Sequence, residues 1–193
     1  MSEIKTISKD EINSLPIRRY EGEVVLVASA RDVERAHEDF GAERLVGFDT
    51  ETRPTFKVGQ KYPAALAQVA TARAVYLFQL QTLDFSPLLR PLLGSTTVKA
   101  GVGIGDDIKA LRELFAFEPN GIADLGAIAR KKGYERSGVR ALAAMFLGCR
   151  IPKGAKTSNW AAPRLSQQQI VYAATDAWAC RELYLRFESL GII

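Results

Sequence analysis

Residues 45–52 have the sequence LVGFDTET, an apolar run that ends in two carboxylates, Asp49 and Glu51. The apolar part predicts a buried β-strand over residues 45–50. Because side chains two residues apart on a strand point to the same face, both carboxylates project together. Two adjacent carboxylates repel each other unless a cation lies between them, and divalent ions such as Mg²⁺ and Mn²⁺ take such oxygen ligands. The alternative is an aspartate that caps the next turn beside a solvent-exposed glutamate.

The segments on either side of this strand alternate between strand and helix patterns. Further strands are predicted at residues 24–27, 64–71, 75–80 and 98–102. Helices are predicted at residues 29–40, 83–93, 106–115, 123–132, 139–147 and 167–190. This order predicts an α/β fold, with a mixed sheet flanked by helices and a mostly helical C-terminal half. Residues 1–22 are expected to form an N-terminal arm or short helix, and residues 23–193 a single domain.

The charge of the chain is unevenly distributed. Its 193 residues carry a net charge of only +4, and the length excludes a second full-sized catalytic module. Residues 130–164, however, contain nine basic residues and one acidic residue, a local charge of +8. The two cysteines, Cys149 and Cys180, lack CxxC spacing, so neither a disulfide framework nor a zinc site is expected. No apolar stretch suits a signal peptide or a membrane span, so a soluble, cytoplasmic protein is expected.

A second pair of acids follows the strand predicted at residues 98–102. Residues 101–107 have the sequence GVGIGDD, which places Asp106 and Asp107 at the start of a helix. N-capping and the helix dipole explain one acid there, but they do not easily explain both. A phosphate-binding loop is the alternative, although the run has neither a following GK[ST] nor the GxGxxG spacing.

The last predicted helix has a well-marked start. Ser166 and Gln169 form a capping-box pattern, so the helix is expected to begin at residue 167. Tyr172 and Asp176 are four residues apart and therefore lie on one face of this helix. Alone, the pair indicates an amphipathic helix with a core tyrosine and an incidental acid. Together with the other acids, it indicates a site to which three separate elements contribute.

Three segments resemble the three sequence motifs of the DEDDy class of 3′-5′ exonucleases. They are VGFDTET (residues 46–52), KAGVGI with Asp107 (residues 99–107) and YAATDA (residues 172–177). The pattern is similar to that of the ribonuclease D group and of the exonuclease domain of the Werner syndrome helicase, and it covers about residues 24–190. The resemblance implies an RNase H-like fold.

The resemblance also implies a site that holds two divalent ions, Mg²⁺ or Mn²⁺, and hydrolyses phosphodiester bonds. The metal ligands are then Asp49, Glu51, Asp107 and Asp176. Asp107 matches the motif acid better than Asp106 does, because of its spacing from the glycine turn. Tyr172 is the tyrosine of the class and would orient the attacking water. The single histidine, His37, lies outside all three motifs, which argues against the histidine base of the DEDDh relatives.

Contacts to nucleic acid are expected near the first motif and in the segment before the last helix. The candidates are Thr50, Tyr62, Lys153, Lys156, Ser158, Asn159, Trp160 and Arg164. The basic members of this set would bind phosphates, whereas Trp160 would either stack on a base or pack the loop. Tyr62 is expected either to contact the terminal nucleotide or to have only a structural role in the core or at the surface. Asp124 is expected to cap a helix rather than to bind a metal.

Three functions remain as alternatives. The leading one is a metal-dependent exonuclease that releases nucleoside 5′-monophosphates from the 3′ end of single-stranded or recessed DNA or RNA. The second is an oligoribonuclease or dinucleotidase that acts on very short RNA. The third is a catalytically silent protein that binds nucleic acid. No membrane contact is expected, and the sequence leaves the oligomeric state and the choice between DNA and RNA open.

Overall fold

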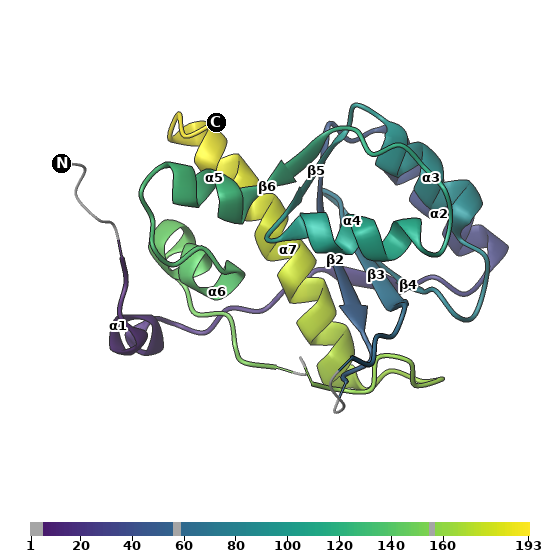
Figure 1. The fold of residues 1–193 in the computed structure, drawn as a ribbon, viewed down its shortest axis with the longest axis horizontal. Helices are drawn as coiled ribbons and strands as arrows, with labels where there is room; N and C mark the ends of the chain where they lie inside the picture. Colours follow the sequence, from purple (N-terminus) through teal and green to yellow (C-terminus); the bar gives the residue numbers. More distant parts are fainter. Residues whose placement is uncertain (1–5, 56–58, 155–156) are drawn as a thin grey trace.

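The computed structural model describes residues 6–55, 59–154 and 157–193, and at its centre is a six-stranded sheet (Figure 1). In sheet order the strands are β1 (Glu23–Leu26), β4 (Ala74–Gln79), β3 (Ala64–Ala70), β2 (Leu45–Thr52), β5 (Val98–Gly101) and β6 (Ile122–Asp124). β3 is antiparallel to both of its neighbours, and the other neighbouring pairs are parallel. The sheet is therefore mixed, as the sequence predicts.

β2 lies inside the sheet between β3 and β5. Its first four residues are buried, whereas the next three, among them Asp49 and Glu51, are half-buried. The register pairs Asp49 with Gln68 and Glu51 with Leu66 on β3, and it shifts directly after Glu51. Both acids therefore lie within the regular part of the strand, on the same face.

One face of the sheet is covered by α2 (Ala30–Gly41), α3 (Ser86–Gly94) and α4 (Ile104–Arg112). Apolar side chains of these helices, such as Phe40 and Ile108, form one buried cluster with Phe48 of β2. Because burial of apolar surface is the dominant favourable term in folding, this cluster anchors β2 in the sheet.

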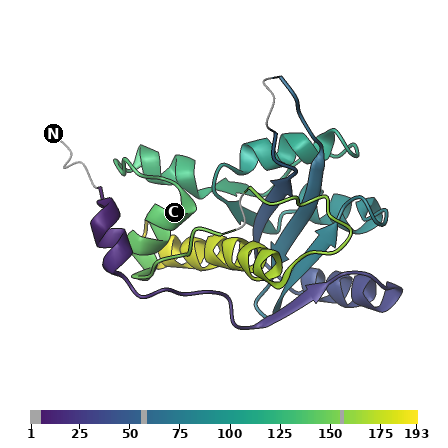
Figure 2. The same cartoon turned by 90° about the horizontal axis from the view of Figure 1, so that it is seen from below.

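The opposite face is crossed by one long helix, α7 (Gln167–Ser189) (Figures 1 and 2). The helix begins at the predicted capping box. The Gln169 backbone nitrogen donates a hydrogen bond to the Ser166 hydroxyl, and the Ser166 backbone nitrogen donates one to the Gln169 side chain. Ala173 and Ala177 are buried against the sheet. Since these side chains are small, the helix backbone packs closely on the strands.

Shorter helices pack around the C-terminal part of α7. They are α5 (Leu125–Lys131) and α6 (Val139–Leu142), with a π-helical segment directly after α6 (Ala143–Leu147). Leu125 and Leu142 share an apolar cluster with Phe187 of α7. This cluster fixes the segment between α4 and α7 against the sheet.

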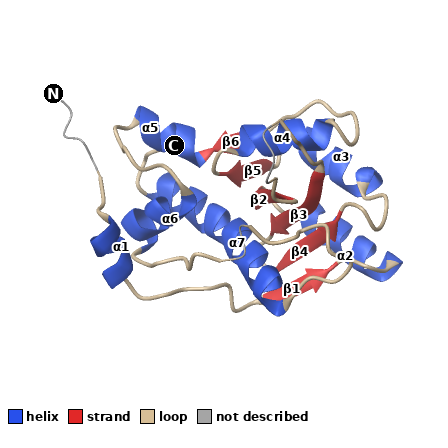
Figure 3. Cartoon of the chain, turned by 60° about the horizontal axis from the view of Figure 1, so that its bottom comes forward, coloured by secondary structure: helices blue, strands red, loops and turns tan. Residues whose placement is uncertain are grey.

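The N-terminal arm contains a helix, α1 (Lys9–Ser14), which lies beside α6 (Figure 3). Its buried side chain, Ile12, packs with Ala141 and Ala144. After the helix, the chain pairs with Arg150. The backbone nitrogen of Arg150 donates to the carbonyl of Pro16 at 2.8 Å, and that of Arg18 donates to the carbonyl of Arg150 at 3.1 Å. The described part of the arm is thus docked on the fold.

The structure differs from the prediction in the segment between α4 and α7. Residues 122–124 form strand β6, where the pattern predicts the start of a helix at residue 123. The strand forms because β5 offers a parallel partner, with Lys99 opposite Ile122 and Gly101 opposite Asp124. The helix predicted at residues 139–147 changes to π geometry at residue 143. Within the described ranges, no helix is long and apolar enough to cross a membrane.

Candidate active site

The position of Asp176 depends on a close contact between α7 and β2 at Gly47. A Cβ atom at this position would lie 1.9 Å from the carbonyl oxygen of Ala177 and 2.8 Å from the backbone nitrogen of Arg181. Any residue other than glycine would therefore push the helix away. Gly47 lies two residues before Asp49 and on the same face, so the contact brings α7 next to the acidic end of β2.

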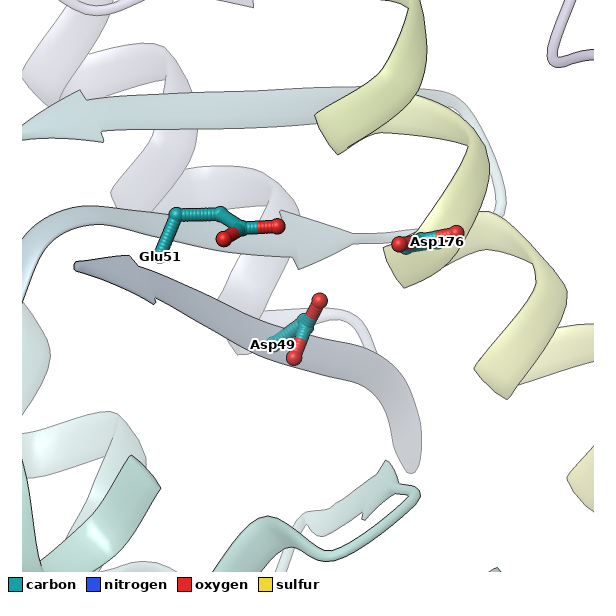
Figure 4. Close-up of side chains that lie close together, drawn as sticks. All are labelled: Asp49, Glu51 and Asp176. Carbon is teal, nitrogen blue, oxygen red and sulfur yellow. The ribbon is translucent and has the colours of Figure 1, made fainter. Parts of the chain in front are cut away.

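This contact brings together three of the four predicted metal ligands. Asp49, Glu51 and Asp176 each offer a carboxylate oxygen, and these oxygens all lie within 4.8 Å of one another. Figure 4 shows the two acids of β2 and the acid of α7 around a common space. Asp176 is buried, and the other two acids are half-buried. A set of carboxylate oxygens at this spacing suits a hard divalent cation.

The electrostatics of Asp49 favour a bound cation. Its pKa is raised well above the usual value, firstly by burial and then by the negative charges of Asp107, Asp176 and Glu51. Burial disfavours the charged form of a carboxyl group, and neighbouring negative charges do the same. A divalent cation among these acids would offset both effects.

The fourth predicted ligand, Asp107, lies in the first turn of α4 and is not a member of the three-carboxylate group. Its carboxylate accepts a hydrogen bond from the Thr50 hydroxyl at 2.5 Å. Burial raises the pKa of Asp107 to about 6, although the hydrogen bond from Thr50 acts in the opposite direction. Its neighbour Asp106 points to solvent, with a side chain that is 93% exposed, and pairs with Lys109 at 3.4 Å. The two adjacent acids therefore occupy different environments.

The turn that carries Asp107 is held by Asp124. The carboxylate of Asp124 accepts hydrogen bonds from the backbone nitrogens of Ala127, at 3.0 Å, and Gly103, at 3.1 Å. Gly103 has a φ of +75°, in the left-handed region that glycine adopts without strain. The bond to Ala127 confirms the predicted capping role of Asp124. The bond to Gly103 adds a contact, which the sequence pattern does not reveal, between α5 and the turn before α4.

Tyr172 lies one helical turn before Asp176, and its hydroxyl lies within hydrogen-bonding reach of the Asp176 carboxylate. Burial raises the pKa of Tyr172 far above its usual value, and the charges of Asp176 and Glu51 act in the same direction. Gly154 lies directly against the ring, because a Cβ atom there would be 2.0 Å from the ring carbon Cδ2. The phenol is therefore fixed in place and protonated at neutral pH.

Some of these groups line a cleft with a volume of about 840 Å³. Its lining includes Asp49, Asp176, Tyr172 and, from the segment before α7, Lys153. The residues that line it without having been predicted include Lys9, Asn13, Arg136, Arg140 and Cys180. The basic block at residues 130–164 is a signal for the two arginines. The sequence pattern holds no comparable signal for the residues of α1, because only long-range packing brings that helix to the cleft.

The predicted nucleic-acid contacts before α7 do not all lie in the cleft. Among the described residues, Lys153 lines it, whereas Ser158, Asn159 and Arg164 do not. The Asn159 carbonyl accepts a hydrogen bond from the Gln169 side chain at 3.2 Å, which ties this segment to α7. The prediction for Lys156 lies outside the described residues.

The two candidates near the first motif have different surroundings. Thr50 is half-buried and donates its hydroxyl hydrogen to Asp107. Tyr62 belongs to the segment before β3, where its ring lies under the guanidinium of Arg53, 4.9 Å from the ring centroid. Its hydroxyl also accepts a hydrogen bond from the Gln60 side chain at 2.6 Å. Thr50 thus contacts the acidic site, whereas Tyr62 contacts its own loop.

Trp160 is a correction to the predicted binding residues. Its side chain is 0% exposed and belongs to the apolar cluster between the sheet and α7, together with Leu77 and Ala173. A fully buried indole offers no face to a base, so the prediction of base stacking is wrong. The alternative of loop packing is confirmed, and it follows from the large apolar area that an indole buries.

Comparison with known proteins identifies the family. The sequence profile of a 3′-5′ exonuclease family matches residues 24–191. The chain is 31% identical over 191 residues to the mouse bifunctional 3′-5′ exonuclease/ATP-dependent helicase WRN, with 93% of this chain and 14% of that protein covered. It is 32% identical over 142 residues to ribonuclease D of Haemophilus influenzae, with 72% and 35% covered. The chain thus spans only a minor part of the length of these relatives.

Solved structures agree on the fold. The exonuclease domain of Nibbler from Aedes aegypti superposes with a TM-score of 0.76 at 24% identity, covering 90% of this chain and 91% of that one. Ribonuclease D of Escherichia coli gives 0.74 at 21% identity, covering 89% and 46%. These matches confirm the predicted α/β fold of a mixed sheet between helices. On its profile match and its relatives, the chain belongs to the 3′-5′ exonuclease family of the ribonuclease D and WRN type.

Proposed function

We propose that this chain is a metal-dependent exonuclease that hydrolyses the terminal phosphodiester bond at the 3′ end of a DNA or RNA strand and releases nucleoside 5′-monophosphates. The observation that carries the proposal is the group of three carboxylates, from β2 and α7, with oxygens within 4.8 Å of one another beside a cleft with cationic walls. The domain that does this is residues 23–193, with residues 1–22 as an arm.

The donor atoms fit divalent ions. Asp49, Glu51 and Asp176 offer only carboxylate oxygens, which are the ligands that Mg²⁺ and Mn²⁺ prefer. Asp107 completes a set of four acids, enough negative charge for two such ions. When bound, the ions supply positive charge that activates a water for attack and neutralises the charge that builds up on the phosphate. Thr50 keeps the Asp107 carboxylate oriented toward the site through its hydrogen bond.

Tyr172 is assigned a positioning role rather than that of a base. Its pKa lies far above neutral pH, so the phenol keeps its proton and acts through hydrogen bonds. The ring is held by Gly154, and the hydroxyl lies within hydrogen-bonding reach of Asp176. From this position, Tyr172 orients the attacking water next to the acids.

The cationic side chains of the cleft are assigned to the phosphate backbone. Lys153 lies in the same cleft as Asp49 and Asp176, so it is the best supported of the predicted phosphate contacts. The other predicted contacts to the nucleic-acid strand stay predictions. They are Thr50, Tyr62, Lys156, Ser158, Asn159 and Arg164. Phosphate contacts of this kind set the affinity and its dependence on salt.

A 5′-labelled oligonucleotide tests the function directly. With Mg²⁺ or Mn²⁺ we expect a ladder that shortens from the 3′ end, and Asp176→Asn should abolish it. The matched control is Asp106→Asn, because this acid is adjacent to Asp107 but points to solvent. Absence of a ladder with either metal, or a ladder that persists in Asp176→Asn, would overturn the proposal.

The same assay separates the substrate classes. RNA, single-stranded DNA and a recessed duplex are compared in parallel, and a length series of RNA starts at the dinucleotide. We expect kcat/KM to rise with length, because the cationic walls extend beyond the acids. A maximum at the dinucleotide would instead assign the chain to the oligoribonuclease class.

A further inference from the structure

The N-terminal helix α1 lies outside the residues that match the exonuclease family, 24–191, yet it forms a wall of the candidate cleft. Lys9, Ile12 and Asn13 of α1 line the same cleft as Asp49 and Asp176. In Figures 1 and 3, α1 lies beside α6, at the opposite end of the molecule from α2 and α3. The family fold therefore accounts for the cleft only in part.

Several contacts stabilise α1 and hold it in this position. Ile12 is 8% exposed and packs on Ala141 and Ala144. The capping box of the helix is complete, because the Glu11 backbone nitrogen donates to the Ser8 hydroxyl at 3.1 Å and the Ser8 backbone nitrogen donates to Glu11 at 2.7 Å. The backbone hydrogen bonds between residues 16–18 and Arg150 fix the segment that joins α1 to β1. α1 is thus a docked element with a defined inner face.

The polar side chains of α1 on the cleft are suited to phosphate. Lys9 and Asn13 are four residues apart, so they lie on one face of the helix, and both are exposed. Lys9 supplies an ammonium group and Asn13 supplies amide N–H donors. They share the cleft with Arg136 and Arg140, whereas the described acids of its lining are only Asp49 and Asp176. A strand whose end lies at the acids would meet donors and positive charge along the rest of the cleft.

We infer that α1 forms a phosphate-binding subsite of the substrate cleft. In this subsite Lys9 and Asn13, with Arg136, hold the backbone of the strand upstream of the bond that is hydrolysed. The inference rests on the proposed function, and it gives the N-terminal arm a role in substrate affinity. Since α1 lies apart from β2, which carries two of the acids (Figures 1 and 3), the subsite acts only on strands long enough to reach α1.

The test is a double variant, Lys9→Ala with Asn13→Ala, assayed on single strands from the dinucleotide upward. On long strands we expect KM to rise about tenfold with kcat unchanged. The slope of log kcat/KM against log salt should decrease by about one, because one phosphate contact from a charged group is lost. Hydrolysis of the dinucleotide should not change. The matched control is Arg31→Ala, which removes one positive charge from an exposed position of α2, at the other end of the fold.

Two results would overturn the inference. An unchanged KM on long strands would show that α1 is no part of the binding site. An equal loss at every length would show that α1 only supports the fold of the cleft. Ile12→Ser provides a second test, because it weakens the docking of α1 and leaves Lys9 and Asn13 in place. This variant should raise KM for long strands in the same way while the melting temperature of the domain changes little.

A binding measurement distinguishes a failure of this inference from a failure of the proposed function. The affinity of a labelled long strand is measured by fluorescence anisotropy in the Asp176→Asn background, with and without the Lys9 and Asn13 changes. We expect Kd to rise about tenfold with the changes. A chain that binds with this pattern but does not hydrolyse would overturn the proposed function alone. A chain that hydrolyses with unaltered Kd in the variant would overturn the subsite alone.

Discussion

Asp49 is a half-buried carboxyl group with other carboxyl groups around it, and its negative charge is therefore costly to the folded protein without metal. In the unfolded chain an aspartate ionises near pH 4. In the folded chain the pKa of Asp49 is raised well above this value, and burial raises that of Asp107 to about 6. Between the two values the folded state keeps protons that the unfolded state has lost. Stability from these groups therefore falls as the pH rises from about 4 through 6 and above.

The direction in which stability changes with pH leads to the first prediction. Metal-free protein with Asp49→Asn should have a higher melting temperature than the unmodified chain at pH 8, and the two should differ less at pH 5. Mg²⁺ should raise the melting temperature of the unmodified chain at pH 8 and have a smaller effect at pH 5, where protons compete with the metal. In Asp49→Asn the effect of Mg²⁺ should be lost. An Asp49→Asn protein that is less stable than the unmodified chain at pH 8 would contradict the electrostatic argument.

The ring of Tyr172 depends on the absence of a side chain at residue 154. Gly154→Ala would place a methyl group 2.0 Å from Cδ2, so the ring must turn and its hydroxyl must leave Asp176. We expect kcat to fall by about tenfold or more, in keeping with the loss of one positioned hydrogen bond. The measurement is a double-mutant cycle. If Gly154 acts through the hydroxyl, Gly154→Ala should cost little further activity in the Tyr172→Phe background.

At the scale of elements, the sequence predicts those whose signals are local. The capping box at Ser166 and Gln169 places the start of α7 at residue 167, as observed. Asp49 and Glu51 are predicted to share a face because the strand period alone decides it. β6 is different, since three residues before a helix carry too little pattern to distinguish strand from helix. Its strand conformation comes from the pairing with β5, a contact distant in sequence.

The packing of α7 on β2 leads to a prediction at the same scale. Gly47→Ala should push α7 away from the sheet and move Asp176 from Asp49 and Glu51. We expect a loss of about 1–3 kcal/mol in the free energy of unfolding, measured in urea, and a loss of activity larger than this destabilisation explains. The control is Gly41→Ala in α2, where a Cβ atom meets nothing within 4 Å. A fully active Gly47→Ala protein would contradict the role of this contact.

At the scale of the whole molecule, the basic block at residues 130–164 divides into parts with different surroundings. Arg136, Arg140 and Lys153 line the cleft. Lys131 lies exposed on α5, and the backbone of Arg150 pairs with the N-terminal arm. Counting charges identifies the block, but it cannot tell which of its residues line the cleft. That depends on how the chain folds around α7. For the same reason, sequence reasoning finds the acids of the site but not the wall that α1 contributes.

This division can be tested with two lysines from the same block. Lys153→Ala and Lys131→Ala remove the same charge, but only Lys153 lines the cleft. We expect Lys153→Ala to raise KM and to lower the slope of log kcat/KM against log salt by about one, whereas Lys131→Ala should leave both nearly unchanged. Both side chains are exposed, so neither change should alter the melting temperature noticeably. Equal effects of the two variants would mean that the block attracts nucleic acid only through its total charge, because a long-range field does not distinguish between two lysines of the same patch.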